Sequence, residues 1–305
     1  MPQVDSVDKQ ILNILAKNCR TPYREIAKSL GISTTAIKGR VDDLVSGGVI
    51  SEFIVRFSPA MIDCEVLLLW LKTDGQEDKT QFISEIGKNR GVIQVSPLYG
   101  GDYLVAVEYT STLEMATVTE AIESNPHVNY TEDHTILMWR GKKTNLTNIQ
   151  LRVLKALVKD ARMQTTDIAR ESGLTVRMVR KALREIKESE AIDFTLRWRL
   201  NVGERLTVLL KLKWDPKQIS RDEVIDIMTK DYPDRWWEII PSASEPVLFA
   251  AMTVDNMNQV DTITTNMKIF PGIIYSDAFT YRPSHNFKGL RRLLLEEAVQ
   301  AAGVR

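Results

Sequence analysis

The apolar residues of the N-terminal segment recur at helical spacing. They are Ile11, Leu12, Leu15, Ile26, Ala27 and Leu30. Thr21-Pro22 predicts the start of a second helix, with Thr21 as the N-cap and Pro22 in the first turn. Gly31 predicts the end of that helix, and Ser33 predicts the N-cap of a third that runs to about Ser46. Three short helices with a tight turn before the third predict a helix-turn-helix.

From residue 65 onward the pattern changes to apolar strands alternating with helices. The expected strands span residues 65–73, 92–98, 103–109 and about 128–138. The expected helices span residues 78–89 and about 112–124. The order βαββαβ is that of the ferredoxin-like fold.

The pattern then repeats. Shifting the sequence by 142 residues places residues 8–50 on residues 150–192 without a gap, and eight of the 43 positions are identical. Among the identical pairs are Arg20 with Arg162 and Gly31 with Gly173. Because the hydrophobic phase is kept over three helices, the chain is predicted to be a tandem duplication.

The second copy predicts the same elements. Thr147-x-x-Gln150 is a capping-box pattern ahead of a first helix, and Ser220-x-x-Glu223 is another at the start of a later one. Strands are expected at 206–214, 235–241, 247–254 and 273–282, with a helix at 256–268. Residues 141–147 and 199–205 are expected to be connections, and residues 286–303 an amphipathic helix without a counterpart in the first copy.

The overall composition does not by itself indicate nucleic-acid binding. Lys+Arg and Asp+Glu are balanced at 40 each, so any basic surface must be local. Cys19 and Cys64 are far apart and have no partner at ligand spacing, and the three His (His127, His134, His285) are scattered. We therefore expect neither a metal nor another cofactor. No signal peptide or membrane span is recognised, and a soluble, cytoplasmic protein is expected.

The first helical segment strongly resembles the winged helix-turn-helix of the Lrp/AsnC (leucine-responsive, feast/famine) transcription regulators. The features that carry this resemblance are Asp8, Arg20-Thr21-Pro22, Ile26-Ala27, Gly31-Ile32-Ser33 and Gly48-Val49-Ile50. The βαββαβ segment that follows resembles the effector-binding and assembly domain of the same family. The resemblance implies dimers that pack the sheets of two such domains, and one chain already holds both halves.

The expected fold is therefore α+β, with two winged helix-turn-helix domains alternating with two ferredoxin-like βαββαβ domains. The first winged domain is expected at 1–58 and the second at 145–200. The ferredoxin-like domains are expected at 62–140 and 204–283, followed by the C-terminal helix at 286–303.

The third helix of a helix-turn-helix presents its N-terminal residues to base edges in the major groove. In the first copy the expected DNA-binding residues are Ser33, Thr34, Thr35 and Lys38, with Arg40 at a phosphate. In the second copy they are Thr175, Arg177, Arg180, Lys181 and Arg184.

The two reading helices differ in charge. Residues 33–46 carry no net charge, whereas residues 175–188 carry a net charge of +3. Because phosphate neutralisation supplies most non-specific affinity, the second copy is expected to be the stronger electrostatic anchor. Lys38 and Arg40 are equally compatible with a merely solvated helix face. Arg20 and Arg162 either contact a phosphate or cap the first helix of their copy.

A Gly-rich segment lies between the second and third strands of the first ferredoxin-like domain, where the family carries a ligand loop. Gly100, Gly101, Asp102 and Tyr103 are therefore candidates for binding an amino-acid-like effector, with glycine amides at its carboxylate and Asp102 at its amino group. The alternative is a hairpin turn in which Asp102 bonds its own backbone. The second copy has residues 242–246 (SASEP) at this place, so we expect no such site there.

The expected function is sequence-specific binding of double-stranded DNA by a transcription regulator, not catalysis, and the expected assembly is a homodimer of tandem chains. Two alternatives remain. One is a protein-binding scaffold, which the neutral net charge permits. The other is an enzyme like the siroheme decarboxylases, which share the tandem architecture and use His and Arg around a tetrapyrrole. That reading lacks a His and Arg cluster near the sensor strands.

Overall fold

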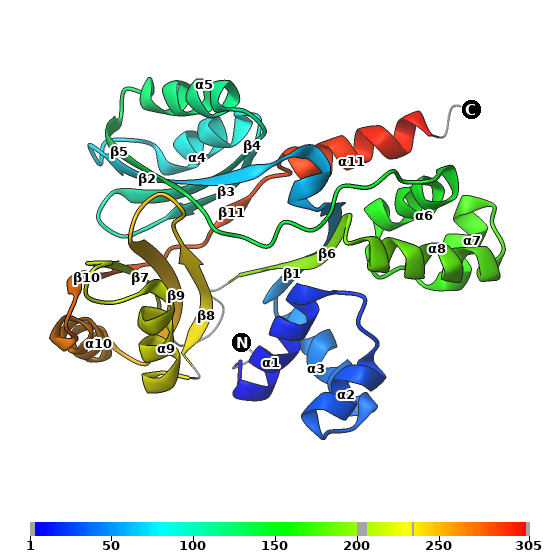
Figure 1. The fold of residues 1–305 in the computed structure, drawn as a ribbon, viewed down its shortest axis with the longest axis horizontal. Coiled ribbons are helices and arrows are strands. Elements are labelled where there is room, and N and C mark those ends of the chain that lie inside the picture. The colour runs from blue at the N-terminus through cyan, green and yellow to red at the C-terminus, as the bar shows by residue number, and fades with distance from the viewer. Residues whose placement is uncertain (1–3, 200–205, 234, 303–305) are drawn as a thin grey trace. The chain divides into compact units, whose positions relative to one another are not determined.

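The computed structural model describes residues 4–199, 206–233 and 235–302 (Figure 1). They form two compact units that do not follow the order of the chain. The helix-turn-helix unit contains residues up to 64, residues 139–199 and the C-terminal residues from 288. The sheet unit contains residues 65–138 and the second ferredoxin-like segment up to 287. Each unit therefore takes one domain from each copy.

The helix-turn-helix unit contains two sets of three helices. They are α1 (Ser6–Lys17), α2 (Tyr23–Leu30) and α3 (Thr34–Ser46), then α6 (Asn148–Lys159), α7 (Thr165–Ser172) and α8 (Val176–Ser189). α2 and α7 both end at a left-handed glycine, Gly31 with φ 68° and Gly173 with φ 61°. Glycine reaches this conformation without steric cost, which is why the turn before each third helix falls where the sequence predicts it.

One predicted cap is wrong. Pro22, not Thr21, occupies the N-cap of α2, and no side chain caps that helix. The Thr21 hydroxyl instead donates to the carbonyl oxygen of Asn18 at 2.8 Å. The capping box Thr147–Gln150 is confirmed at the start of α6, and a further box formed by Asp5 and Asp8 starts α1.

An antiparallel ribbon of two strands joins the two helical sets. The strands are β1 (Ile50–Phe57) and β6 (Ile192–Trp198), which follow α3 and α8 in the chain. Each strand also packs against the first helix of the other copy, β6 against α1 and β1 against α6. The Cys19 amide donates to the Phe194 carbonyl at 2.9 Å, and the Thr195 hydroxyl donates to the Ala16 carbonyl at 2.7 Å. The two helix-turn-helix domains therefore share their cores.

The C-terminal helix α11 (Leu290–Ala301) packs on α6 and β1 within the same unit. Leu295 and Val299 are buried in the core of the second helical set. The helix begins later than the predicted residue 286 because Gly289, with φ 72°, interrupts the chain before it. The predicted end at residue 303 lies outside the described residues.

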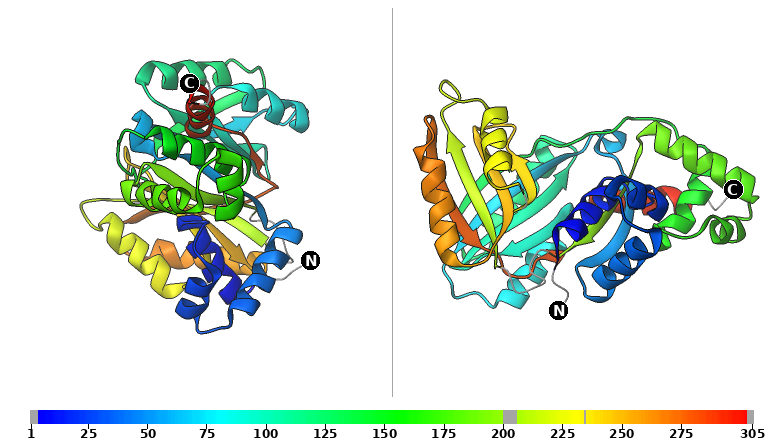
Figure 2. Two further views of the ribbon diagram at one scale, coloured as in Figure 1. Left: turned by 90° about the vertical axis from the view of Figure 1, so that its right-hand side faces the viewer. Right: turned by 90° about the horizontal axis from the view of Figure 1, so that it is seen from below.

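The sheet unit contains two four-stranded antiparallel sheets, each with two helices on one face (Figures 1 and 2). The first has strands β2 (Glu65–Thr73), β3 (Val92–Pro97), β4 (Asp102–Tyr109) and β5 (Val128–Thr135), with α4 (Lys79–Lys88) and α5 (Thr112–Glu123). The second has β7 (Leu206–Trp214), β8 (Trp236–Pro241), β9 (Val247–Val254) and β10 (Ile273–Thr280), with α9 (Arg221–Asp231) and α10 (Met257–Ile269). A short strand β11 (His285–Asn286) extends the first sheet beside β3.

The strand orders β3-β4-β2-β5 and β8-β9-β7-β10 are the same in the two sheets and are those of the ferredoxin-like fold. Alternation along each strand gives each sheet two apolar faces. One face carries the helices, with Leu67, Leu69 and Leu71 beneath α4 and α5. The opposite faces of the two sheets form a common core that includes Leu68, Trp70, Leu104, Leu209 and Phe249. The helices α9 and α10, yellow and orange in Figure 2, lie on the outer side of the second sheet.

The last strand of each copy is shorter than predicted, for the same reason in both. β5 ends at Thr135 and β10 at Thr280, and the residues after each strand pair with the other sheet. Ile136 bridges Ser242, and Tyr281 bridges Leu98. Because an apolar run continues through this crossing, the sequence shows no break where the chain changes sheets.

Candidate nucleic-acid interface

α8 is held by its apolar face and exposes a basic one. The hydroxyl of Thr175 caps the helix by accepting a hydrogen bond from the Met178 amide at 3.2 Å. Val179, Ala182 and Ile186 are buried beneath the helix. Thr175 itself stays exposed, and its own hydroxyl proton is free to be donated outward.

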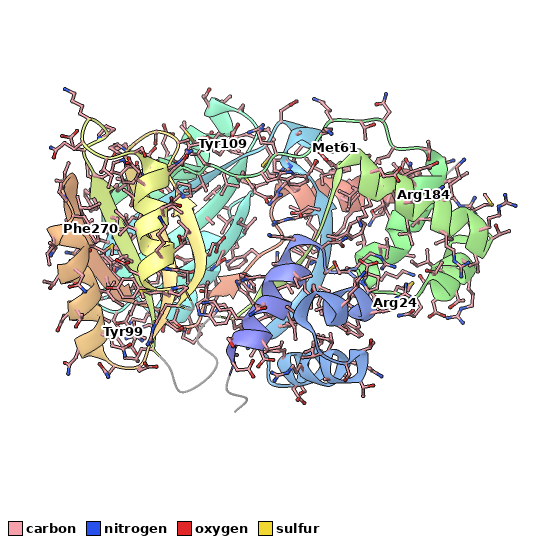
Figure 3. The ribbon with its side chains drawn as sticks, turned by 60° about the horizontal axis from the view of Figure 1, so that its bottom comes forward. Arg24, Met61, Tyr99, Tyr109, Arg184 and Phe270 are labelled. Atoms are coloured by element: carbon pink, nitrogen blue, oxygen red, sulfur yellow. The ribbon has the colours of Figure 1, made fainter. Side chains whose placement is uncertain are left out.

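The four predicted cationic residues of α8 lie on its exposed side. They are Arg177, Arg180, Lys181 and Arg184, the last of which is labelled in Figure 3. Lys181 lies 3.6 Å from Glu185, a spacing typical of a weak surface pair. Within the part of the chain that the structure describes, the three arginine side chains have no ion-pair or hydrogen-bond partner. Their charge is therefore available to a partner such as DNA.

α3 has the same construction with much less charge. Ser33 caps it by accepting from the Ala36 amide at 3.1 Å, and Ile37, Val41 and Leu44 anchor it. Thr34, Thr35 and Lys38 are exposed as predicted, next to the cap.

Arg40 takes a role that differs from the predicted phosphate contact. Its Nη1 donates to Asp5 and Asp8, both at 2.8 Å, and so ties α3 to the start of α1. These hydrogen bonds raise the pKa of Arg40, whereas the pKa of Asp5 is lowered because its bonds to the Asp8 amide and to Arg40 outweigh the effect of burial. Among the residues that the structure describes, Lys38 is then the cation of α3 that has no partner.

Arg20 and Arg162 neither cap their own helices nor face outward. Arg20 donates to the carbonyl oxygens of Ala161 at 2.6 Å and Met163 at 3.1 Å, which belong to the other copy. Arg162 donates to the Cys19 carbonyl and lies 4.6 Å from the ring centre of Tyr23. The recurrence of arginine at this position of the repeat is therefore explained by a reciprocal contact between the two domains. Neither of the two predicted roles applies.

One residue that sequence reasoning missed supports the second reading helix. Arg152 of α6 donates through Nε and Nη2 to the carbonyl of Ser172, the last residue of α7. A cation at a helix C-terminus stabilises the unpaired carbonyls there. The equivalent residue of the first copy is Gln10, so only an unmatched arginine inside the repeat could have signalled this contact.

The predicted effector loop lies between β3 and β4. Gly100 and Gly101 have φ of 97° and 88°, a conformation that side chains other than glycine rarely adopt. Asp102 does not bond its own backbone, because its Oδ1 accepts a hydrogen bond from Trp70 Nε1 at 2.9 Å. The loop is thus a turn that requires glycine, with one carboxylate held in place by an indole.

Tyr103 points away from that loop into the helix-facing core. It is 1% exposed, and its hydroxyl donates to Glu77 Oε1 at 2.7 Å. Burial and this carboxylate raise the pKa of Tyr103. Thr73 donates to the other oxygen of Glu77 at 2.9 Å. Because strand neighbours face opposite sides, Tyr103 lies on the other face of the sheet from Asp102, and the prediction that it contacts an effector is wrong.

The second copy supplies a cation to the same loop. Arg282 stacks on Tyr99, 4.2 Å from the ring centre, and its amide donates to the Pro97 carbonyl at 2.8 Å. Its Nε is buried and, among the described residues, has no hydrogen-bond partner. The loop that replaces the glycine turn in the second copy is closed by Ser242, whose hydroxyl accepts from the amides of Ser244 and Glu245.

Other candidate chemistry is sparse in the described residues. Cys19 and Cys64 are buried and are not joined in a disulfide. No group of three His, Cys, Asp or Glu in that part of the chain could hold a metal ion. No helix there is long and apolar enough to cross a membrane.

Both helix-turn-helix segments match known domain families. Residues 4–45 match the AsnC-type helix-turn-helix domain, and residues 146–192 match a winged helix-turn-helix DNA-binding domain. The HTH-type transcriptional regulator LrpA of Pyrococcus horikoshii is 34% identical over 102 residues, which are 33% of this chain and 72% of that protein. The HTH-type transcriptional regulator LysM of Sulfurisphaera tokodaii is 33% identical over 139 residues, which are 45% of this chain and 97% of that protein.

A whole-chain likeness is found with a solved structure, that of the siroheme decarboxylase NirDL. It covers 98% of this chain and 100% of that chain with a TM-score of 0.62, at 13% sequence identity. At this identity the likeness extends to the fold alone. The matched domain families and the identity with the single-copy regulators are similarities of sequence, so they can show the family. The chain belongs to the Lrp/AsnC family of helix-turn-helix transcription regulators, in a tandem form with two DNA-binding domains.

Proposed function

We propose that this DNA-binding transcription regulator engages one asymmetric DNA site with both reading helices of a single chain. The observation that carries this proposal is the shared β1–β6 ribbon, which joins the two helix-turn-helix domains in one compact unit. Two identical domains would favour a palindrome, since operator symmetry mirrors protein symmetry. Here the domains differ in sequence and charge, so the two half-sites are expected to differ as well.

The two reading helices, α3 and α8, have different roles in this proposal. α8 supplies affinity, because Arg177, Arg180 and Arg184 are exposed without partners in the described chain and can neutralise phosphates. α3 supplies discrimination through Thr34, Thr35 and Lys38, whose short polar groups and single charge suit base-edge contacts. Ser33 and Thr175 cap their helices and offer one hydroxyl proton each to a neighbouring phosphate. Arg40 is left out of the DNA contacts because Asp5 and Asp8 hold it.

In vitro selection from random duplexes with the purified full chain tests the single-site proposal. We expect two unlike half-sites whose centres are separated by one helical turn, about 10 base pairs, or by a multiple of it. In a parallel selection with Thr34→Ala and Lys38→Ala, one half-site should lose its sequence preference while the other is kept. Enrichment of a perfect palindrome, or of one half-site alone from the wild-type chain, contradicts the proposal.

We further propose that the Gly100–Asp102 loop binds a small zwitterion such as an amino acid. Its ammonium group would meet Asp102, and its carboxylate would meet the loop amides and Arg282. The positive φ of both glycines and the unpartnered Nε of Arg282 support this assignment. The loop of residues 242–246 lacks these features, so one site per chain is proposed.

Calorimetric titration with individual amino acids tests the effector site. Asp102→Asn keeps the acceptor for Trp70 but removes the charge that an ammonium group needs, and binding is expected to weaken about tenfold or more. Ser244→Ala in the second loop is the matched control and should leave binding unchanged. If no amino acid binds the wild-type chain, or if both variants bind like the wild type, the loop is only a turn.

We propose a homodimer of tandem chains, and because the two sheets already pack against each other within one chain, that dimer would use other surfaces. Light scattering of the purified protein measures its mass directly.

We propose a cytoplasmic regulator without catalytic activity. The fold shared with the siroheme decarboxylase NirDL makes added siroheme the relevant check, and an unchanged absorption spectrum is the expected result. A scaffold role predicts no salt-dependent binding to any duplex.

A further inference from the structure

A partly buried ion pair lies in the core between the two sheets. Lys211 of β7 donates to Glu132 of β5 at 2.6 Å, and the two side chains are only 14% and 27% exposed. The other oxygen of Glu132 lies 2.9 Å from His134 Nε2, and His134 is fully buried. The Lys211 ammonium also lies 5.2 Å from the ring centre of Trp70. Charges in such a core are costly unless they are paired, so their placement needs a reason.

These residues occupy matching positions of the two copies without matching each other. Trp70 is the sixth residue of β2, and Lys211 is the sixth of β7. Glu132 and His134 of β5 correspond in the same way to Asp277 and Phe279 of β10. The first copy thus brings an indole, an acid and an imidazole, and the second copy brings an ammonium group, an acid of its own and a phenyl ring.

Trp70 and Lys211 touch although they are equivalent, so this position lies on the pseudo-twofold axis that relates the sheets. At such a position, pairing of two identical domains places a residue against its own copy. Two first domains would place Glu132 and His134 against Trp70 without the ammonium group, whereas two second domains would set each Lys211 against Asp277 of the other domain. The pairing of two first domains leaves the partly buried carboxylate without its cation, which pairing of unlike domains avoids.

The pKa of Glu132 agrees with this description. Burial pushes it upward, but the hydrogen bond and charge of Lys211, together with His134, bring it below its ordinary value. The carboxylate is therefore charged in the folded protein, and its main stabilising partner, Lys211, belongs to the other copy.

We propose that the Lys211–Glu132–Trp70 cluster is a specificity determinant that makes the second ferredoxin-like domain the partner of the first. It disfavours the pairing of two first domains from different chains, and the covalent link then favours the partner in the same chain, through an effective concentration of about millimolar. When the two sheets of one chain pair with each other, the DNA-binding unit of that chain contains one α3 and one α8.

Charge reversal in the full chain tests the cluster. Lys211→Glu and Glu132→Lys should each lower the urea unfolding midpoint of the sheet unit, and the combined variant should recover most of that loss. Mixing the two single variants should restore complementarity between chains. Native mass spectrometry is then expected to show a one-to-one complex of the two, which neither single variant nor the wild type forms with a differently tagged copy of itself through these faces.

Co-expression of the two single variants, with a tag on one, covers the case in which either fails to fold alone. Recovery of the untagged chain with the tagged one, and not with tagged wild type, supports the proposal. Two results overturn it. One is a combined variant no more stable than the single variants. The other is a mixture or co-expression that yields no more complex than the wild-type controls.

Discussion

Replacing Arg177 and Arg180 together with alanine is expected to lower the affinity for DNA about tenfold or more at low salt. Both guanidinium groups are exposed on α8 and have no partner in the described chain, so they have no other contact to lose. For each phosphate contact that the variant lacks, fewer counterions are released from the DNA on binding. The slope of log affinity against log salt should therefore decrease in magnitude by about 1 per arginine.

Fluorescence anisotropy with a labelled duplex at several salt concentrations measures both quantities. Arg221→Ala with Lys230→Ala on α9 is the matched control, because it removes the same charge from the sheet unit. Unfolding midpoints should be nearly unchanged in both variants. If affinity and salt slope stay at the wild-type values, α8 is a solvated face and the proposed anchor is wrong.

Replacing Arg20 and Arg162 with methionine is expected to loosen the helix-turn-helix unit. The two side chains donate to backbone carbonyls of Ala161, Met163 and Cys19 across the boundary between the copies. Losing such a charge-assisted bond to a partly buried carbonyl costs about 1.5–3 kcal/mol. The double variant should therefore lose about 3–4 kcal/mol, less than the simple sum because methionine keeps some packing.

Urea unfolding measures that loss, and DNA binding reveals its consequence. A duplex with both half-sites should lose more affinity than one with a single half-site, because the variant no longer holds α3 and α8 in a fixed relation. Arg24→Met on the exposed side of α2 is the control, since Arg24 (Figure 3) has no described partner. Equal losses on both duplexes would mean that the two arginines stabilise the fold without coupling the heads.

The local parts of the fold follow from the sequence because their causes are local. Gly31 and Gly173 end their helices in the left-handed conformation that only glycine adopts cheaply. Helical and alternating periods mark most elements within a residue or two, apart from the end of β5 and the start of α11, and the repeat shows that the architecture occurs twice. The exposed cations of α8 and the glycine loop at 100–101 are visible in the same way, as residue types at known places within an element.

The partners of these elements are decided only in three dimensions. Arg20, Arg40 and Tyr103 look like phosphate or ligand contacts in the sequence, yet each binds a group far away along the chain or on the opposite face of its strand. The β1–β6 pairing joins segments more than a hundred residues apart, and no local period encodes which strand covers which helix. The sequence by itself determined the duplication, the element order and the charge difference between the reading helices. Only the tertiary structure decided which copy completes which core, because strand pairing and burial of charge depend on contacts between distant segments.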